Sequence, residues 1–313
     1  MPRARTPSNA EDFKLRDASS YDPVVAEFER WTTRYTTPLA EKLVDLADLR
    51  DGQEVLDIGT GTGIVALLAG AKVMPTGRVL GIDLSEPMLA TAAGKSRRVG
   101  LSQIEFQRMD AEKLNLGDRS FDAALSLYAL LHFPHPEAAL QEMYRVLRPG
   151  GILVVAVGSS PPLSLRGIAQ RATRLPDLMR QMRGKLLLAP QFLDLLVNKH
   201  LPAPADPEES PLAAESRNRT RSVPRLVRDA GFTHLRCHWE HRADCIESPE
   251  EFWDLQRTYS SISRKRLSNS PRQKVEALRK DFFERCRDVQ ARGGRLVYHR
   301  AAFYVIARRP LAS

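Results

Sequence analysis

Short apolar runs alternate with longer amphipathic segments through the first half of this chain. The short runs predict buried β-strands, and the segments in which apolar residues recur every three or four positions predict helices packed against them. This alternation is typical of a parallel, doubly wound α/β sheet with helices on both faces. The expected strands of the first half cover residues 55–58, 78–83, 104–107, 121–126 and 152–157.

Helices are expected before and between these strands. Residues 1–18 are polar, and we expect them to be loose, whereas 21–35 and 38–49 are predicted to form two helices. A further helix should begin at Pro136, because proline is well suited to a first helical turn. Its expected core face is formed by Leu140, Met143, Tyr144 and Leu147.

The alternation stops after residue 157. An apolar and basic segment, 163–201, is expected to be helical, and the stretch 202–215 is rich in Pro, Glu and Ala, which favours a mobile linker. A helix at 223–230 and a sixth strand at 232–244 follow. A second helical insert is then expected, and after it a last strand, antiparallel to the sixth, at 296–307. The core stripe of the second insert should consist of Val275, Leu278, Phe282, Cys286 and Val289.

The two inserts follow the carboxyl ends of the fifth and sixth strands, and ligands of open α/β sheets bind at that edge. We therefore expect the inserts to form a lid and to supply most of a substrate pocket. The predicted fold is a Rossmann-like, doubly wound, seven-stranded sheet with an antiparallel last strand and helical inserts. Its expected parts are a loose N-terminus (1–18), a ligand-binding core (19–157), a lid insert with a linker (158–221), more core (222–247), a second insert (248–294), and a last strand with a tail (295–313).

The most informative motif reads Glu-Val-Leu-Asp-Ile-Gly-Thr-Gly-Thr-Gly and ends at Gly63. Glycines at a strand-to-helix turn let the backbone approach a ligand and adopt φ values closed to other residues. The helix N-terminus behind them offers N–H groups to an anionic group. About twenty residues later the second strand ends in Asp83, a carboxylate that can accept both hydroxyls of a ribose. Together these features predict a site for a nucleoside-type ligand.

The glycine spacing separates two classes of such ligands. Nicotinamide and flavin sites carry G-x-G-x-x-G. Here the glycines are Gly59, Gly61 and Gly63, and Asp57 precedes them in a D-x-G-x-G-x-G pattern. With the acid at the end of the second strand, this pattern resembles the class I S-adenosylmethionine-dependent methyltransferases. Later motifs that strengthen the resemblance are Asp110-Ala111, the run from Phe121 to His132, and Arg145-Val146-Leu147-Arg148-Pro149-Gly150-Gly151.

The resemblance, which covers roughly residues 21–157, points to the subgroup of quinone-biosynthesis and other small-molecule methyltransferases. It implies S-adenosyl-L-methionine as the cofactor and a small-molecule methyl acceptor. Asp57 would shape the glycine turn, Asp83 would hold the ribose, and Ser126 would face the methionine end. The cofactor-binding residues implied in this way are Asp57, Gly59, Gly61, Gly63, Asp83, Leu84, Met88, Asp110, Ala111 and Ser126.

A general base is a separate question. His132 and His135 follow the fourth strand, at the rim where an acceptor should lie. Histidine titrates near neutrality and can take a proton from an acceptor, so His132 is a candidate catalytic base, with local packing as the equal alternative. For His135 we favour a local role, although it lies in the expected substrate pocket. Tyr128 either lines that pocket or belongs to the core. His234, His238 and His241 do not share one face of a strand, so no metal site is expected.

Composition limits the class of protein. The formal net charge of +9 suits a nucleic acid or an anionic lipid as partner, but the arginines are scattered and no recognised nucleic-acid module accompanies them, so we favour a solvated surface. No stretch approaches the roughly 20 apolar residues of a membrane span, and the first residues lack the apolar region of a secretory signal. Three cysteines without C-x-x-C spacing favour reduced thiols and a cytoplasmic chain.

Three alternatives stay open beside methylation of a small, partly apolar molecule at O, C or N. An RNA- or protein-modifying methyltransferase would suit the basic charge, although Ser126-Leu127-Tyr128-Ala129 stands where base-amine methylating enzymes carry an Asn/Asp-Pro-Pro-aromatic motif. Peripheral contact with a membrane, through 183–188 and 192–197, would suit a lipophilic quinone-type acceptor. The third alternative is a protein that binds the cofactor without turnover.

Overall fold

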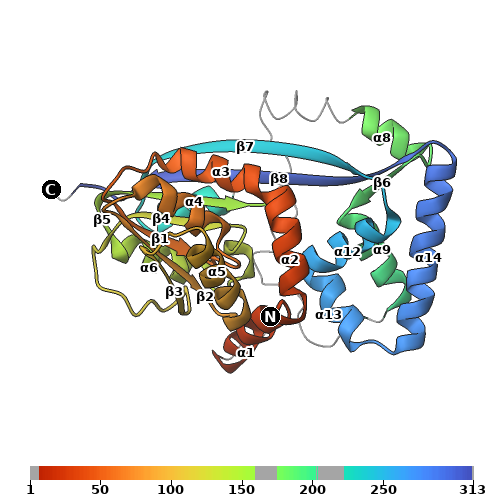
Figure 1. Ribbon diagram of the computed structural model, residues 1–313, viewed down its shortest axis with the longest axis horizontal. Coiled ribbons are helices and arrows are strands. Elements are labelled where there is room, and N and C mark those ends of the chain that lie inside the picture. Colours follow the sequence, from red (N-terminus) through yellow and green to blue (C-terminus); the bar gives the residue numbers. More distant parts are fainter. Residues whose placement is uncertain (1–6, 159–174, 202, 204–221, 312–313) are drawn as a thin grey trace. The chain divides into compact units, whose positions relative to one another are not determined.

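The chain forms the mixed α/β sheet that its apolar pattern predicts (Figure 1). The computed structural model describes residues 7–158, 175–201, 203 and 222–311. Two compact units are present: unit 1 comprises the described residues of 1–159, 210–240 and 302–313, and unit 2 those of 160–209 and 241–301. The units divide after residue 240 and before residue 302, inside the sixth and the last expected strands. The boundaries expected from the sequence, at 247 and 294, lie outside those strands.

Unit 1 holds a parallel sheet whose strands run in the order β3-β2-β1-β4-β5, with β8 antiparallel to β5 and β7 paired with β8. Its strands are β1 (Glu54–Ile58), β2 (Arg78–Asp83), β3 (Ile104–Arg108), β4 (Phe121–Leu127) and β5 (Leu147–Val157), with parts of β7 (Thr233–Ile246) and β8 (Arg295–Arg308). Its helices are α1 (Pro7–Ser19), α2 (Val25–Trp31), α3 (Thr37–Ala47), α4 (Ile64–Val73), α5 (Glu86–Arg98), α6 (Pro136–Val146) and α11 (Ser222–Asp229), with the short helical segments η1 (Asp22–Val24), η2 (Thr32–Thr36) and η3 (Leu130–His132).

The sheet of unit 1 buries both of its faces, because side chains alternate along each strand. One cluster joins Val55, Leu125 and Val154 of the sheet to α3 and α4. The opposite cluster joins Leu56 and Val155 to α6 and α11. The doubly wound arrangement expected from the sequence is therefore confirmed.

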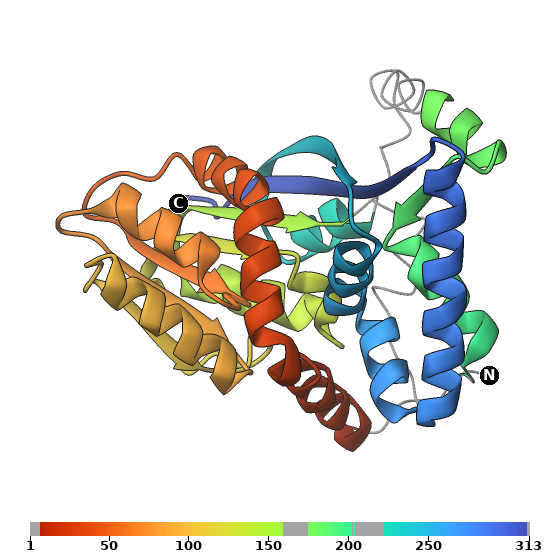
Figure 2. The ribbon, with the colours of Figure 1, turned by 45° about the vertical axis from the view of Figure 1, so that its right-hand side comes forward.

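Unit 2 contains the parts of β7 and β8 between residues 241 and 301, the short strand β6 and five described helices. These elements are α8 (Leu175–Met182), β6 (Leu186–Ala189), α9 (Gln191–His200), α12 (Pro249–Tyr259), α13 (Ser261–Asn269) and α14 (Arg272–Ala291). Figure 2 shows α9 running beside α14 within this unit. The rings of Phe192, Phe252 and Phe282 meet at centroid distances of 5.0–6.3 Å, so aromatic packing joins α9, α12 and α14.

Four of the five residues of the predicted α14 stripe are buried, namely Leu278, Phe282, Cys286 and Val289. Four of the five apolar residues of 192–197 are also buried, namely Phe192, Leu193, Leu196 and Val197, and Leu195 is exposed. This segment therefore packs inside unit 2 instead of offering a broad apolar face. None of the described helices is both long and apolar enough to cross a bilayer.

Two expectations about the elements are wrong. The described part of the sheet has eight strands, not seven, because Leu186–Ala189 pairs in parallel with Arg295–Tyr298 of β8 as strand β6 within a segment expected to be helical. The first residues are not loose from 7 onward, since Pro7–Ser19 forms α1. This helix is held by ion pairs of Lys14 and Asp17 instead of a strong apolar stripe. The expected 202–215 linker lies, apart from residue 203, outside the described residues.

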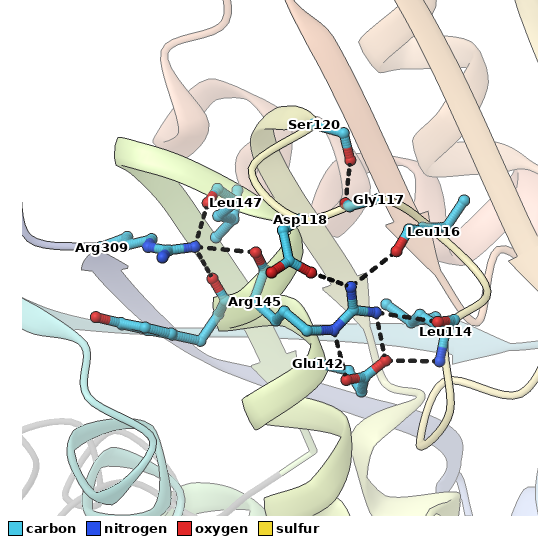
Figure 3. A network of polar contacts seen from close by, with 10 residues as sticks. Leu114, Leu116, Gly117, Asp118, Ser120, Glu142, Arg145, Leu147 and Arg309 are labelled. Carbon is cyan, nitrogen blue, oxygen red and sulfur yellow. Dashed lines mark hydrogen bonds and ion pairs between the residues drawn. The ribbon is translucent and has the colours of Figure 1, made fainter.

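Arg145 anchors the loop between β3 and β4 to the last turn of α6 (Figure 3). Its guanidinium donates to both carboxylate oxygens of Glu142 at 2.8 and 2.7 Å and to Asp118 at 2.6 Å. It also donates to the carbonyls of Leu114 and Leu116 at 3.0 and 2.8 Å. In the described part of the chain the loop has no strand or helix partner for these two carbonyls, and Arg145 supplies their hydrogen bonds instead.

We expect Arg145→Met to lower the free energy of unfolding by about 3 kcal/mol, because several charge-assisted hydrogen bonds are lost together. Urea denaturation of the two proteins measures the change. Arg225→Met is the matched control: Arg225 and Asp229 form an exposed pair at 3.5 Å, and its loss should cost no more than about 0.5 kcal/mol. Equal losses for the two variants would contradict a special role for Arg145.

Candidate functional site

The residues predicted to bind the cofactor lie where β1, β2, β3 and β4 end. The four strands are parallel, so their carboxyl ends share one edge of the sheet. Asp57 and Asp83 lie at the ends of β1 and β2, Asp110 follows β3, and Ser126 lies near the end of β4. Tyr128 and His132 follow β4 at the same edge.

The glycine turn after β1 is tied directly to Asp83. Gly59, Gly61 and Gly63 all have positive φ, at 69°, 53° and 83°. The Gly61 N–H donates to one carboxylate oxygen of Asp83 at 2.9 Å, and the Ser85 N–H donates to the other at 3.0 Å. The carboxylate expected to hold a ribose is therefore fixed by two backbone N–H groups and cannot swing away from the turn.

Gly59 is the position at which the turn tolerates no side chain. A Cβ atom built there would lie 2.2 Å from the Cβ of Ala129, which follows β4. At Gly61 the nearest atom to such a Cβ would be Cε1 of Phe28 in α2, at the ordinary distance of 3.7 Å. The turn is thus packed closely against the chain after β4, and α2 covers it at Gly61.

Burial raises the pKa of Asp83, and the hydrogen bonds from Ser85, Gly61 and Leu84 and the charge of His132 oppose this rise. His132 follows β4, and Asp83 ends β2, at the same edge of the sheet.

Asp57 is almost fully buried and accepts a hydrogen bond from Thr60 Oγ1 at 2.6 Å. Burial raises the pKa of Asp57 to about 7; the hydrogen bonds from Thr60 and the Ala66 N–H oppose the rise, and the charge of Asp83 adds to it. In an unfolded chain the pKa of aspartate is about 3.9. From about pH 4 to about pH 7 the folded chain therefore holds a proton that the unfolded chain has released, and stability falls as pH rises.

We expect Asp57→Asn to remove this pH dependence. Between pH 5 and pH 7 the wild-type protein should lose about 2 kcal/mol of unfolding free energy relative to the variant, at about 1.4 kcal/mol for each full unit of differential protonation. Urea denaturation at pH 5, 6, 7 and 8 measures both curves. Asp45→Asn, an exposed carboxylate of α3, is the control that should leave the slope unchanged. Parallel curves for wild type and Asp57→Asn would contradict the assignment.

Polar atoms lacking protein partners mark room for a ligand at the turn. The hydroxyls of Ser126 and Thr62 are buried and have no hydrogen-bond partner among the described residues. A buried hydroxyl without a partner is costly, and a bound polar molecule would satisfy it. The donors, acceptors and glycine cradle present here therefore fit a nucleoside that carries an amino acid.

Tyr128 has a φ of +64°, which an aromatic residue rarely adopts. Such a backbone costs on the order of 1–3 kcal/mol and clusters at functional sites. The side chain is half-buried and packs against the core cluster that joins the sheet to α3 and α4. His135 is exposed; its Nδ1 lies 3.7 Å from Glu137 and its backbone N–H donates to Glu112 at 2.8 Å.

The sequence reasoning missed the contribution of α1. Lys14 pairs with Asp110 at 2.5 Å and with Glu112 at 3.1 Å, and although burial opposes it, these two partners raise the pKa of Lys14. Asp17 is bonded to His132 at 2.7 Å. No spacing rule could find these contacts, because the partners lie about 100 positions apart in the chain. Among the described residues, no group of three or more His, Cys, Asp or Glu is arranged to hold a metal ion.

Residues 56–155 match a family described as "Methyltransferase domain". One relative, the ubiquinone/menaquinone biosynthesis C-methyltransferase UbiE of Pseudomonas fluorescens, is 39% identical over 145 residues, which are 46% of this chain and 56% of that protein. Another, the nocamycin O-methyltransferase of Saccharothrix syringae, is 35% identical over 48% of this chain and 51% of that protein. The chain thus spans about half the length of the curated relatives it matches.

Solved structures agree on the fold. A putative methyltransferase from Bacillus halodurans superposes with a TM-score of 0.53 and 21% identity, covering 87% of this chain and 98% of that one. The [4+2]-cyclase SpnF superposes with a TM-score of 0.53 and 22% identity, covering 89% and 83%. The matched family and the fold agree: residues 56–155 match a methyltransferase domain, and the chain shares its fold with a solved structure described as a methyltransferase.

Proposed function

We propose that the protein transfers a methyl group from S-adenosyl-L-methionine to a small, partly apolar molecule by in-line displacement. The observation that carries the proposal is the glycine turn after β1, whose Gly61 N–H is bonded to Asp83 at 2.9 Å. The matched methyltransferase domain, which covers this turn and Asp83, supports the same conclusion.

The cofactor would lie along the carboxyl edge of β1 to β4. Gly59, Gly61 and Gly63 would contact its methionine portion, and Asp57 would hold the turn in shape through Thr60. Asp83 would accept the ribose hydroxyls. The remaining contacts would come from Leu84 and Met88 on the adenine ring, Asp110 and Ala111 at the adenine edge, and Ser126 near the methionine amino group.

The ion pair between Lys14 and Asp110 bears on the adenine contact. With one carboxylate oxygen of Asp110 bonded to Lys14 and the other to the Glu112 N–H at 2.9 Å, the side chain is held in one orientation. A fixed carboxylate binds an amino group at a smaller entropic cost than a mobile one.

When bound, S-adenosylmethionine supplies a methyl group on a positively charged sulfur, and the electrons of the broken carbon–sulfur bond stay on that sulfur. The chain then has to bring the acceptor into line, exclude water and take up the acceptor's proton. His132 is the candidate for the proton, while Tyr128 and His135 would border the acceptor.

Relatives support a small acceptor. One is named for ubiquinone and menaquinone biosynthesis and another for O-methylation of nocamycin, so both C- and O-acceptors occur among similar proteins. If the acceptor is a lipophilic quinone, the protein would carry out the same methyl transfer at a membrane surface. The RNA- or protein-modifying alternative gains no support from these relatives. SpnF, which is named a cyclase, illustrates that the same fold also carries other activities.

Calorimetry and label transfer test the proposal together. We expect S-adenosylmethionine and S-adenosylhomocysteine to bind with micromolar affinity, and NAD to give no heat. Methyl-labelled S-adenosylmethionine should then label reduced quinone head-groups, phenols or fractions of host metabolites. Binding of NAD in place of the sulfonium would overturn the proposal. Tight binding of S-adenosylmethionine with no labelled product would favour the alternative of a binding protein without turnover.

A further inference from the structure

Asp17 and His132 form a pair that neither the family match nor the proposed cofactor contacts explain. His132 Nδ1 lies 2.7 Å from a carboxylate oxygen of Asp17, on α1. The two residues stand 115 positions apart in the chain. The ring of Tyr21 packs edge-on against the imidazole, with ring centroids 6.0 Å apart. Asp17 and Tyr21, which both contact the imidazole, thus belong to the N-terminal region of unit 1.

The two partners differ sharply in exposure. The Asp17 side chain is 6% exposed, whereas that of His132 is 37% exposed. A buried carboxylate is costly unless a hydrogen-bonded partner satisfies it. The imidazole satisfies it with one nitrogen while part of the ring still meets solvent. A buried carboxylate that contacts a partly exposed imidazole can orient that imidazole as a base, which two exposed ion-pair partners cannot do.

The contact determines which nitrogen of His132 carries the hydrogen. A carboxylate only accepts hydrogen bonds, so its contact with Nδ1 requires an N–H there. In the neutral ring Nε2 then becomes the proton acceptor. When Nε2 takes up a proton, the buried Asp17 charge stabilises the imidazolium across 2.7 Å.

We propose that Asp17 is a positioning residue that holds His132 as the Nδ1–H tautomer, with Nε2 ready to remove the acceptor's proton; the inference rests on the proposed function. As the acceptor's electron pair forms the bond to the methyl carbon, the acceptor's O–H, N–H or C–H proton passes to Nε2, and it leaves later to water. The class of acceptor is thereby narrowed to molecules that must lose a proton on methylation.

A purely mechanical role for Asp17 is the competing explanation, since the contact also fastens α1. The helix has an independent fastening through Lys14, which pairs with Asp110 and Glu112. Lys14→Ala is therefore the matched control: it removes a fastening of the same helix without touching His132. A mechanical role makes the two variants equivalent at His132, and a positioning role makes them different.

One test needs no turnover: NMR of protein labelled with ¹⁵N in its histidine side chains reports the tautomer of His132 through the imidazole ¹⁵N chemical shifts. His132→Gln identifies its signal among the seven histidines. We expect a protonated Nδ1 and an unprotonated Nε2 in the neutral ring of wild type and of Lys14→Ala. Asp17→Ala should shift the ring toward the Nε2–H form, which an unconstrained imidazole prefers. A wild-type ring already in the Nε2–H form, or the same tautomer in wild type and Asp17→Ala, overturns the inference.

Kinetics separate this inference from the proposed function. With an acceptor found by label transfer, Asp17→Ala should lower kcat about 100-fold, the scale of acid–base catalysis, and leave the calorimetric Kd for S-adenosylmethionine within about twofold. Asp17→Glu should recover part of kcat. An unchanged kcat in Asp17→Ala refutes the positioning role while methyl transfer stands. Absence of S-adenosylmethionine binding by wild type refutes the proposed function, and the tautomer result is unaffected.

Discussion

Replacing Asp83 by alanine is expected to weaken the binding of S-adenosylmethionine about 100-fold. A carboxylate that accepts hydrogen bonds from a sugar contributes about 1.5–3 kcal/mol per contact, and about 1.4 kcal/mol corresponds to a factor of ten. The same change removes the acceptor for the Gly61 and Ser85 N–H groups, at 2.9 and 3.0 Å, so the turn loses its fixed position as well. Titration calorimetry of the two proteins gives the ratio of Kd values.

Asp83→Asn tests whether binding needs both acceptor oxygens of the carboxylate and not only a side chain of that size. The amide keeps the size of the side chain but turns one acceptor into a donor, which cannot serve both backbone N–H groups. We expect it to bind almost as poorly as the alanine variant. Glu86→Gln is the matched control, because Glu86 lies three positions away, is exposed, and forms an ion pair with Arg108 at 3.2 Å. Circular dichroism checks that each variant is folded. Wild-type affinity in Asp83→Ala would refute the assigned site.

Replacing Gly59 by alanine should lower the free energy of unfolding by about 3 kcal/mol and abolish cofactor binding. The added Cβ would lie 2.2 Å from the Cβ of Ala129, so the turn or the chain after β4 has to move. Overpacking costs about 1–3 kcal/mol, and a left-handed backbone costs a residue with a side chain about 1–2 kcal/mol more than glycine. The φ of Gly59 is +69°.

Two other glycines calibrate this prediction. Gly61→Ala meets only the conformational cost, because its φ is +53° but its nearest neighbour would be 3.7 Å away, and we expect a loss of about 1 kcal/mol. Gly94, in α5, has open space around it and no positive φ, so Gly94→Ala should stabilise the protein by up to about 1 kcal/mol. Urea denaturation of the series should give this order. Similar losses in Gly59→Ala and Gly61→Ala would show that the contact with Ala129 relaxes freely.

The predictable part of the fold is the part whose signals are local. β2 has the predicted bounds, and α4 begins directly behind the glycine turn as expected, because apolar runs and the glycine turn act within a few residues. Strand β6 escaped detection for the opposite reason. Its four residues, Leu186–Ala189, read as part of an apolar helical segment, and they form a strand because Arg295–Tyr298 of β8 lies beside them. Pairing partners about 110 positions away leave no trace in local periodicity.

The N-terminal helix shows the same limit at the candidate site. α1 is polar, and between residues 10 and 19 Phe13 is its one buried apolar residue, so nothing in its pattern predicts an ordered element. Its order comes with the ion pairs that Lys14 and Asp17 make with residues beyond β3 and β4. The histidine itself could be selected from its place after the fourth strand, but its partner could not.

The sequence by itself determined the parallel sheet, the glycine turn and the acid that ends β2, because each depends on residues that are neighbours along the chain. The tertiary structure alone decided that Asp83 is bonded to Gly61, that Ala129 closes the space at Gly59, and that Asp17 faces His132. These contacts arise only when parallel strands bring their carboxyl ends to one edge and α1 reaches that edge, a consequence of packing and not of local propensity.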